Sequence, residues 1–416
     1  MAIACGVDFG TSNSTVGWVR PGQPSLLALE DGKTTLPSVV FFNADEDAVR
    51  YGRAALLDYL EGYDGRLMRS LKSLLGTPLM EGQTEVAGRA LPFRQLLGQF
   101  IGELKGRAEQ AAGREFSSVV LGRPVYFIDD DPDADRLAED TLAGIARAAG
   151  FRDIAFQYEP IAAAFDYESR IEREELVLIA DIGGGTSDFS LLRLGPGRRD
   201  RLDRRDDILA TGGVHLGGTD FDKYLSLASV MPLLGYGSSL ASGAAIPSSY
   251  YFNLATWHTI NLAYTRKSVV QLDDLVRDAA EPAKLRRLKA LVEDRAGHWL
   301  AMQVEGAKIG LSSAEQVELE LDRLSPPGAL RIERAAFVDA VAGLVDGIGA
   351  AVRRLLDEAG VAPEQVDTVF FTGGSSGVGA LRERIAAIVP DARRVEGDLF
   401  GSIGSGLAID AARKFG

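Results

Sequence analysis

The sequence has little of what disulfide-stabilised, nucleic-acid-binding or membrane-spanning proteins need. A single cysteine, Cys5, excludes an intrachain disulfide, and because it lies in an apolar stretch we expect it to be buried. The net charge of -14 excludes nucleic acid as a bulk electrostatic partner. No uninterrupted apolar run reaches the length of a membrane span, and the first residues lack the order of segments that marks a signal peptide. We therefore expect a soluble, cytoplasmic protein with no membrane partner.

Several common catalytic and nucleotide-binding patterns are also missing. The sequence has no Gly-x-x-x-x-Gly-Lys-Ser/Thr loop and no Gly-x-Gly-x-x-Gly that opens a helix after an early strand. Its three histidines, His215, His258 and His298, are too widely spaced to predict a zinc site. No nucleophile-elbow pattern is present, and one cysteine without other support does not indicate a catalytic thiol. P-loop enzymes and dinucleotide-binding domains are thereby excluded.

The composition is that of an ordinary globular protein. Apolar residues make up 46% and charged residues 25% of the 416 positions, a length that suits two or three hydrophobic cores. One segment, 198–207, stands out because five arginines alternate there with four aspartates. Since the charges nearly cancel, we interpret this segment as a solvated hairpin tip.

Two short loops of the same chemical kind are the most informative feature present. The loop 8–13 follows the apolar stretch 3–7, and the loop 181–188 follows the apolar stretch 176–180. In each, an aspartate ends the strand, glycine opens the turn and hydroxyl residues follow, so backbone N–H groups can approach phosphate oxygens. A carboxylate beside a triphosphate is repelled unless a cation lies between them. Asp8 and Asp181 therefore predict bound Mg²⁺ together with a nucleotide.

Strand-like and helix-like segments alternate along the chain, which predicts parallel sheets covered by helices. The apolar spacing predicts helices over 93–112, 133–149 and 334–359, the last ended by Gly360. A long helical pattern covers 281–311, and with the Ser-, Gly- and Tyr-rich stretch 228–253 it predicts a mobile helical lid. A purely structural role for that insertion stays open.

Two further glycine-rich turns strengthen the nucleotide interpretation. The turn 211–222 leads into a helix, and helix N-termini attract phosphate. The turn 373–375 also stands between a strand and a helix. Each pair of glycines is weak evidence alone, but several of them beside two acidic phosphate loops are considerably more specific.

The segments 7–14, 181–188 and 215–222 resemble the three signature segments of the seventy-kilodalton heat-shock chaperones of the DnaK type. Further matches follow in the family's order at 123–127, 159–164, 305–313 and 372–375. The matches cover only the nucleotide-binding half of such a chaperone, so we expect no peptide-binding domain, as in the truncated bacterial group called YegD. The resemblance implies an α/β actin-like ATPase fold of two lobes, each with a ribonuclease-H-like mixed sheet and smaller inserted subdomains. It places lobe I at 1–172 with an insertion at about 39–115, lobe II at 173–394 with the lid at about 219–307, and a terminal helix at 395–416 that returns to lobe I.

The resemblance also implies the roles of individual residues. Asp8 and Asp181 match the aspartates around the magnesium and its waters, and Lys72 matches the lysine that helps position the attacking water. Glu159, Thr186 and Asp188 match residues that surround the same site. The residues that match the family's contacts to phosphate, ribose and adenine are Gly10, Thr11, Ser12, Asn13, Gly183, Gly184, Gly185, Thr186, Gly217, Gly218, Glu305, Lys308, Ile309, Ser312, Gly373, Gly374, Ser375 and Asp398.

Three positions depart from the family's pattern. Ile309 and Gly377 stand where the family has arginines near the adenine, so cation stacking on the base is lost and we expect weaker or less base-selective binding. An ordinary packing role for Ile309 is an equal alternative. The segment 129–132, Asp-Asp-Asp-Pro, stands where the family supplies an arginine to an allosteric relay, which puts that relay in doubt.

Three functions remain open on these residues. The first is an ATP-binding, slowly hydrolysing, Mg²⁺-dependent chaperone-like switch that binds ATP and ADP and acts on an unidentified protein partner or client. The second is a metabolite kinase or phosphohydrolase, and the third is an actin- or FtsA-like scaffold. The order of the motifs favours the first.

Overall fold

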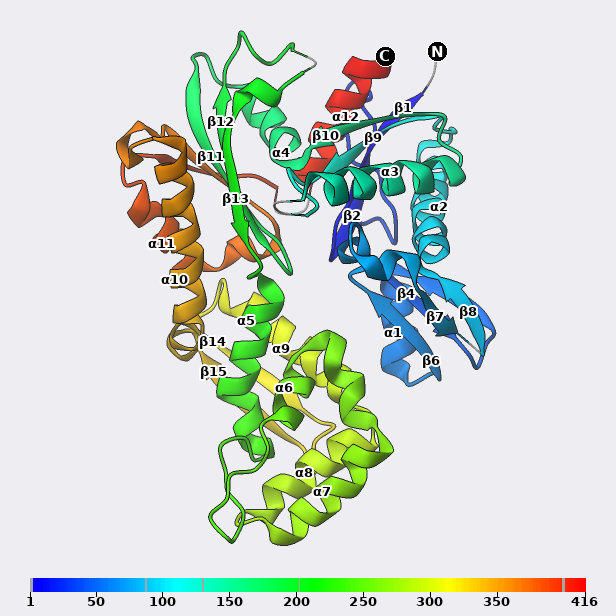
Figure 1. The fold of residues 1–416 in the computed structure, drawn as a ribbon, viewed down its shortest axis with the longest axis vertical. Coiled ribbons are helices and arrows are strands. Elements are labelled where there is room, and N and C mark those ends of the chain that lie inside the picture. Colours follow the sequence, from blue (N-terminus) through cyan, green and yellow to red (C-terminus); the bar gives the residue numbers. More distant parts are fainter. Residues whose placement is uncertain (1–2, 87, 129–130, 202, 399–400) are drawn as a thin grey trace.

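A computed structural model describes residues 3–86, 88–128, 131–201, 203–398 and 401–416. Two five-stranded sheets form the centres of two halves (Figure 1). The first sheet has the order β10 (Asp153–Tyr158), β9 (Ser118–Arg123), β1 (Ala4–Phe9), β2 (Asn13–Gly17) and β3 (Thr35–Pro37). The second has the order β13 (Ile208–Val214), β12 (Ser187–Leu194), β11 (Glu175–Ile182), β16 (Thr368–Thr372) and β17 (Arg393–Glu396).

The two sheets share one topology. In the first, β1 pairs antiparallel with β2, β2 pairs antiparallel with β3, and β1 and β10 both run parallel to β9. In the second, β11, β12 and β13 are antiparallel, whereas β16 runs parallel to β11 and β17. Each predicted loop thus follows the strand at which antiparallel and parallel pairing meet. The prediction of two similar α/β units is confirmed, with mixed rather than purely parallel sheets.

Helices cover the sheets, and smaller elements are inserted at the end away from the termini (Figure 1). The helices are α1 (Gly52–Glu61), α2 (Phe93–Ala112), α3 (Pro132–Ala148), α4 (Glu159–Glu168), α5 (Gly218–Leu225), α6 (Ser249–Ala255), α7 (Arg266–Asp278), α8 (Pro282–Glu293), α9 (Gly297–Leu311), α10 (Arg334–Ala359), α11 (Gly379–Ile388) and α12 (Ser402–Phe415). The short strands are β4 (Val39–Asn43), β5 (Ala48–Tyr51), β6 (Gly65–Arg69), β7 (Gln83–Val86), β8 (Arg89–Pro92), β14 (Gln316–Leu321) and β15 (Gly328–Glu333).

The strongest sequence periodicities are confirmed. Helices α2 and α10 have the predicted bounds, and their apolar stripes are buried against the sheets. Gly360 ends α10 with a φ of 63°, a left-handed conformation that costs glycine little. Cys5 is buried as expected. The lobe boundaries proposed for the chain stay a prediction.

The long helical pattern over 281–311 is wrong in one respect. The structure has two helices there, α8 and α9, separated by a turn in which Arg295 has a φ of 50°. Leu288 and Leu291 before the turn and Trp299 and Leu300 after it are buried in the same core. The apolar pattern therefore continues through the turn, and periodicity alone does not reveal the break.

Helix α10 also has the length and mean hydropathy of a membrane span. It is the one such helix among the described residues, and its buried stripe packs on β13 and α11. A core helix that faces a sheet passes the same test, so α10 gives no indication of a membrane protein.

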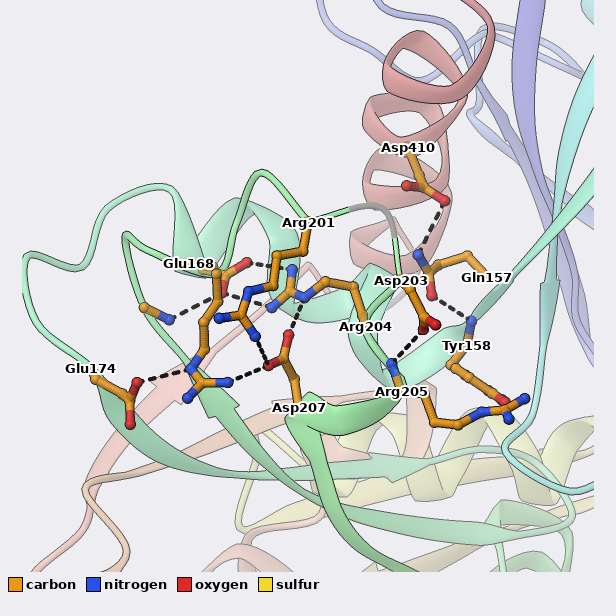
Figure 2. Close-up of polar contacts among 12 residues, drawn as sticks. Gln157, Tyr158, Glu168, Glu174, Arg201, Asp203, Arg204, Arg205, Asp207 and Asp410 are labelled. Carbon is orange, nitrogen blue, oxygen red and sulfur yellow. Dashed lines mark hydrogen bonds and ion pairs between the residues drawn. The ribbon is translucent and has the colours of Figure 1, made fainter.

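The interpretation of the segment 198–207 as a solvated tip is wrong for two of its residues. The side chains of Arg204 and Asp207 are each only 1% exposed. Arg204 donates two hydrogen bonds of 2.8 Å to Glu168, at the end of α4, and a third to Asp207 (Figure 2). Arg198 donates to the same aspartate at 2.5 Å. This arginine-aspartate cluster anchors the β12–β13 hairpin to α4, because a buried guanidinium needs carboxylate partners.

The two halves touch each other through side chains of their inserted elements. Tyr59 of α1 shares a hydrogen bond with Nδ1 of His298 on α9, and the His298 ring lies 4.8 Å from the ring of Trp257. The guanidinium of Arg69, on β6, lies 4.5 Å from the centre of the Trp257 ring and 3.6 Å from the Glu305 carboxylate. Side chains of the inserted elements of one half therefore pack directly on the lid of the other.

The arginine-aspartate cluster predicts unequal effects of two arginine substitutions in one hairpin. Arg204→Ala leaves the buried Glu168 and Asp207 without their main partner, which we expect to lower the free energy of unfolding by about 3–5 kcal/mol. Arg201→Ala is the matched control, because its side chain is 52% exposed and lies 3.8 Å from Asp207. We expect it to cost less than about 1 kcal/mol. Urea unfolding followed by circular dichroism measures both, and equal effects would contradict the buried network.

The burial of His298 predicts that the free energy of unfolding depends on pH. Burial lowers the pKa of His298 from 6.5 to about 4, so the folded protein keeps the imidazole neutral. Between these two values the unfolded chain binds more protons, so stability falls as pH drops through that window. The variant His298→Gln does not titrate there. We expect the wild type to lose more unfolding free energy than the variant between pH 7 and pH 4, and parallel curves would refute the assignment.

Candidate functional site

The first predicted loop is held by Ser38, which lies between β3 and β4. Ser38 donates from its hydroxyl to the Gly10 carbonyl at 2.7 Å and from its backbone N–H to the Ser12 carbonyl at 2.9 Å. Asn13 opens β2, and a Cβ on Gly10 would lie 2.1 Å from its carbonyl oxygen. The loop is therefore tight and its turn has no room for a side chain, as a phosphate loop requires.

The second loop meets the first directly. A Cβ on Gly184 would lie 2.3 Å from the hydroxyl oxygen of Ser12, so the two loops are in contact across the halves. Within the second loop, the Gly183 N–H donates to the Thr186 carbonyl at 2.9 Å. The two acidic glycine loops therefore lie at one place, where the halves meet.

The glycine turn before α5 packs on the second loop. The N–H groups of Gly218 and Thr219 donate to the carbonyls of Gly183 and Gly184 at 3.0 and 2.7 Å. A Cβ on Gly217 would lie 2.7 Å from the Gly184 carbonyl. The N-terminus of α5 thus lies against the second loop, where its positive dipole end favours an anion.

A lysine and three carboxylates gather beside these loops. The Lys72 ammonium lies 2.5 Å from a Glu159 carboxylate oxygen, and each side chain is 12% exposed. Burial alone would lower the pKa of Lys72, but Glu159, Asp8 and Asp181 outweigh it and raise the pKa above its ordinary value. The lysine therefore stays charged.

For the two aspartates, in contrast, the surroundings favour the neutral form. Burial, and then the Glu159 carboxylate, raise the pKa of Asp8, which is 8% exposed. Burial, followed by Asp188, Glu159 and Asp8, raises the pKa of Asp181 well above its usual range. Carboxylates that repel each other in a buried site fit a cation placed between them. The residues present therefore suit Mg²⁺.

The number of ligands available is small. Within the described ranges, no group of three or more His, Cys, Asp and Glu side chains is arranged to hold a metal ion. A cation between Asp8 and Asp181 would complete its shell with water and phosphate oxygens, which is the habit of Mg²⁺. Thr186 lies next to this position and donates to Asp188 at 2.7 Å.

Several of the residues expected to contact the nucleotide meet on the second half. The Lys308 ammonium donates to the Gly218 carbonyl at 3.1 Å and to the Asp222 carboxylate at 2.9 Å. A Cβ on Gly218 would lie 2.3 Å from the Ser375 hydroxyl, which brings the 373–375 turn to the same place. Gly373 has a φ of 80°, and a Cβ there would lie 2.4 Å from an Asp181 oxygen.

The remaining expected contacts are more dispersed. Ile309 is 62% exposed on α9, and the position of a Gly377 Cβ lies 3.9 Å from the Ser312 hydroxyl. Gly374 and Gly377 bound the short turn that follows β16. Glu305 faces Arg69 across the cleft, and Asp398 lies ahead of α12, where its carbonyl accepts from Ser402 at 2.9 Å. Packing does not bury Ile309, so the alternative of an ordinary core role is wrong.

Sequence reasoning overlooked Asp222. Burial raises its pKa to about 6, although the Lys308 ammonium opposes that shift, and its carboxylate holds this lysine in place. The available signal was its place four residues after Gly218, which puts both on the same side of α5. Pairing with a lysine 86 positions away leaves no mark in a single sequence.

A large cavity of about 1420 Å³ opens between the halves. Its walls include Thr11 and Ser12 of the first loop, Gly184 and Gly185 of the second, and Trp257 at the mouth. The cleft therefore leads from the contact between the halves down to both loops.

Comparisons with known proteins agree with this geometry. The family model described as Hsp70 protein matches residues 4–230 and 273–410. Chaperone protein HscA of Citrobacter koseri is 28% identical over 98% of this chain, and the chain spans 58% of the length of that relative. The segment 231–272, which contains Trp257, lies outside the family match. With its two mixed sheets in the actin-like ATPase arrangement and the family's motifs at the cleft, the chain belongs to the Hsp70 family.

Proposed function

We propose that this chain binds ATP and ADP with Mg²⁺ between its two halves and hydrolyses ATP slowly. The observation that carries the proposal is the Lys72–Glu159 ion pair beside Asp8 and Asp181, where the two glycine loops touch. Proteins of the Hsp70 family bind these nucleotides, typically with Mg²⁺. The bound cation would supply charge neutralisation on the phosphates and orient the phosphoryl group.

The chain's own groups would do the rest by positioning and charge. Backbone N–H groups of the loops around Gly10 and Gly183 would hold phosphate oxygens. Lys72, oriented by Glu159, would direct a water toward the terminal phosphate and offset the charge that develops there. Asp8 and Asp181 would hold the waters of the cation. No covalent intermediate is needed.

We further propose that nucleotide acts by changing the distance between the halves. The contacts of Tyr59 with His298 and of Arg69 with Glu305 join the two sides of the cleft, so a nucleotide that favours the closed form shifts the population of both. The partner would be a client or regulatory protein, as the chaperone name of the relative suggests. A likeness to the YegD group, the lack of a peptide-binding domain, the lobe boundaries and a cytoplasmic location stay predictions.

The kinase and scaffold alternatives make different demands. A metabolite kinase transfers the phosphoryl group to an acceptor, and a scaffold assembles through large apolar strips. Incubating the protein with radiolabelled ATP separates these functions, because the proposed switch releases labelled orthophosphate while a kinase labels a second molecule. Size-exclusion chromatography with and without ATP shows whether the chain assembles into polymers.

Lys72→Ala tests the hydrolytic role. Since the lysine orients the water and offsets developing charge, we expect single-turnover hydrolysis to slow by about 100-fold while ATP affinity changes by less than about 5-fold. Lys289→Ala is the control, because that lysine pairs with Asp273 on the surface of the lid. Equal rates for the wild type and Lys72→Ala would sink the catalytic assignment.

Ile309→Arg tests the base-binding side. The exposed position can carry a guanidinium over the adenine, and cation stacking of about 1 kcal/mol corresponds to an affinity gain of about 5-fold for ATP. Ile309→Met, which adds no charge, is the control. Fluorescence titration measures both variants, and an unchanged affinity in the arginine variant means that Ile309 does not face the base.

A further inference from the structure

A small chamber of about 80 Å³ adjoins the reaction centre on the side of β12 and β13. We call it the rear chamber. Its walls include the carboxylates of Glu159, Asp181 and Asp188 and the hydroxyl of Thr186, none of which lines the large cleft. The same acids that surround the proposed hydrolysis site therefore also face a second space.

The rear chamber adjoins a groove of about 1450 Å³ along the free edge of β13, which we call the rear groove. Five residues line both spaces: Val125, Tyr126, Thr211, Gly212 and Gly213. Tyr126, at this junction, is 58% exposed. The carboxylates of Glu159, Asp181 and Asp188 thus have a route to the outer surface other than the nucleotide cleft.

A missing side chain keeps this route open. Gly213 pairs with Asp188 across β13 and β12, and a Cβ there would lie 3.0 Å from an Asp188 carboxylate oxygen. Thr211 pairs with Ser190 two positions along, on the same face. Gly212 points the other way, since its Cβ would lie 3.5 Å from Leu355 of α10. Gly212 therefore lines the chamber with its backbone alone, whereas the Cβ positions of residues 211 and 213 lie on the chamber face.

The wall of the rear groove is anchored. Arg204 and Arg205 line it, and Arg204 is held by both oxygens of Glu168 (Figure 2). The hairpin that carries β13 is therefore tied to α4, the helix that begins with Glu159.

We propose that the rear chamber and rear groove form a water passage to the hydrolysis site. The lining suits water, because carboxylates and a hydroxyl offer hydrogen bonds while the negative charge opposes an anion. A cavity holds a water when its volume exceeds about 10–15 Å³, so the chamber of about 80 Å³ has room for water. Bound nucleotide fills the cleft from the other side, which leaves this route to bulk solvent.

The passage would have two tasks, and this inference rests on the proposed hydrolysis. It supplies the water whose oxygen bonds to the terminal phosphorus, while the bond from that phosphorus to the bridging oxygen breaks and its electron pair stays with ADP. The attacking water also loses a proton. That proton leaves through the chamber's waters to the rear groove, which completes the balance of ATP and water to ADP, orthophosphate and a proton.

Filling the passage tests the proposal. Thr211→Leu and Gly213→Val both place apolar bulk on the chamber face, and Gly212→Ala on the opposite face is the matched control. We expect single-turnover hydrolysis to slow by about 10-fold in the first two and to stay within about 2-fold in the control, because a step that awaits water scales with its access. Titration with a non-hydrolysable ATP analogue should give the wild-type affinity in all three, and thermal unfolding identifies a variant that fails to fold.

A crystal structure with the same analogue provides an independent measurement. Ordered waters in the rear chamber, hydrogen-bonded to Glu159 or Asp181 and displaced in Thr211→Leu, are expected. A dry chamber overturns the passage whatever the rates, and so does a folded Thr211→Leu variant that hydrolyses at the wild-type rate. A wild type that binds ATP without hydrolysing it overturns the proposed function as well, so the two failures are distinguishable.

Discussion

Everything at the centre of this protein depends on the repulsion among carboxylates brought together from both halves. Asp8 is the last residue but one of β1, Asp181 is the last residue but one of the equivalent strand β11, and Glu159 begins helix α4. One lysine, Lys72, whose side chain is 12% exposed, offsets only part of their charge. Such a site is costly for folding unless cations and polar ligands enter it, which is why a structure of this kind indicates function and not only stability.

The duplicated sheet topology explains how two distant segments reach the same site. Each half turns its antiparallel-to-parallel junction toward the cleft, and glycines at the junctions let the two loops come into contact at Ser12 and Gly184. Rigid sheets position the loops, while the lid and the inserted elements around α1 close the outer end. Strand β13 is the edge strand of the second sheet, and the rear groove runs along its free edge. The site therefore lies between the large cavity that separates the halves and the rear groove.

The arginine-aspartate hairpin shows where local composition misleads. Alternating charges usually mean a solvated surface, but Glu168, 36 positions away on α4, supplies a carboxylate that pairs with Arg204 in the interior. The prediction of one long helical pattern over 281–311 is wrong for a related reason. Helices α8 and α9 bury their apolar residues in the same core, so the apolar spacing continues across the turn between them. In both cases the deciding contact is distant in sequence.

The sequence by itself determined the strands and helices with strong periodicity, the two acidic glycine loops and the family. These features are local, since apolar spacing, strand-ending aspartates and turn glycines act within a few residues. Only the tertiary structure decided that Lys72 pairs with Glu159, that Asp222 holds Lys308, and that Tyr59 meets His298 across the cleft. Each of these pairs joins elements far apart in the chain, and their energies depend on burial, which exists only once the two halves have packed together.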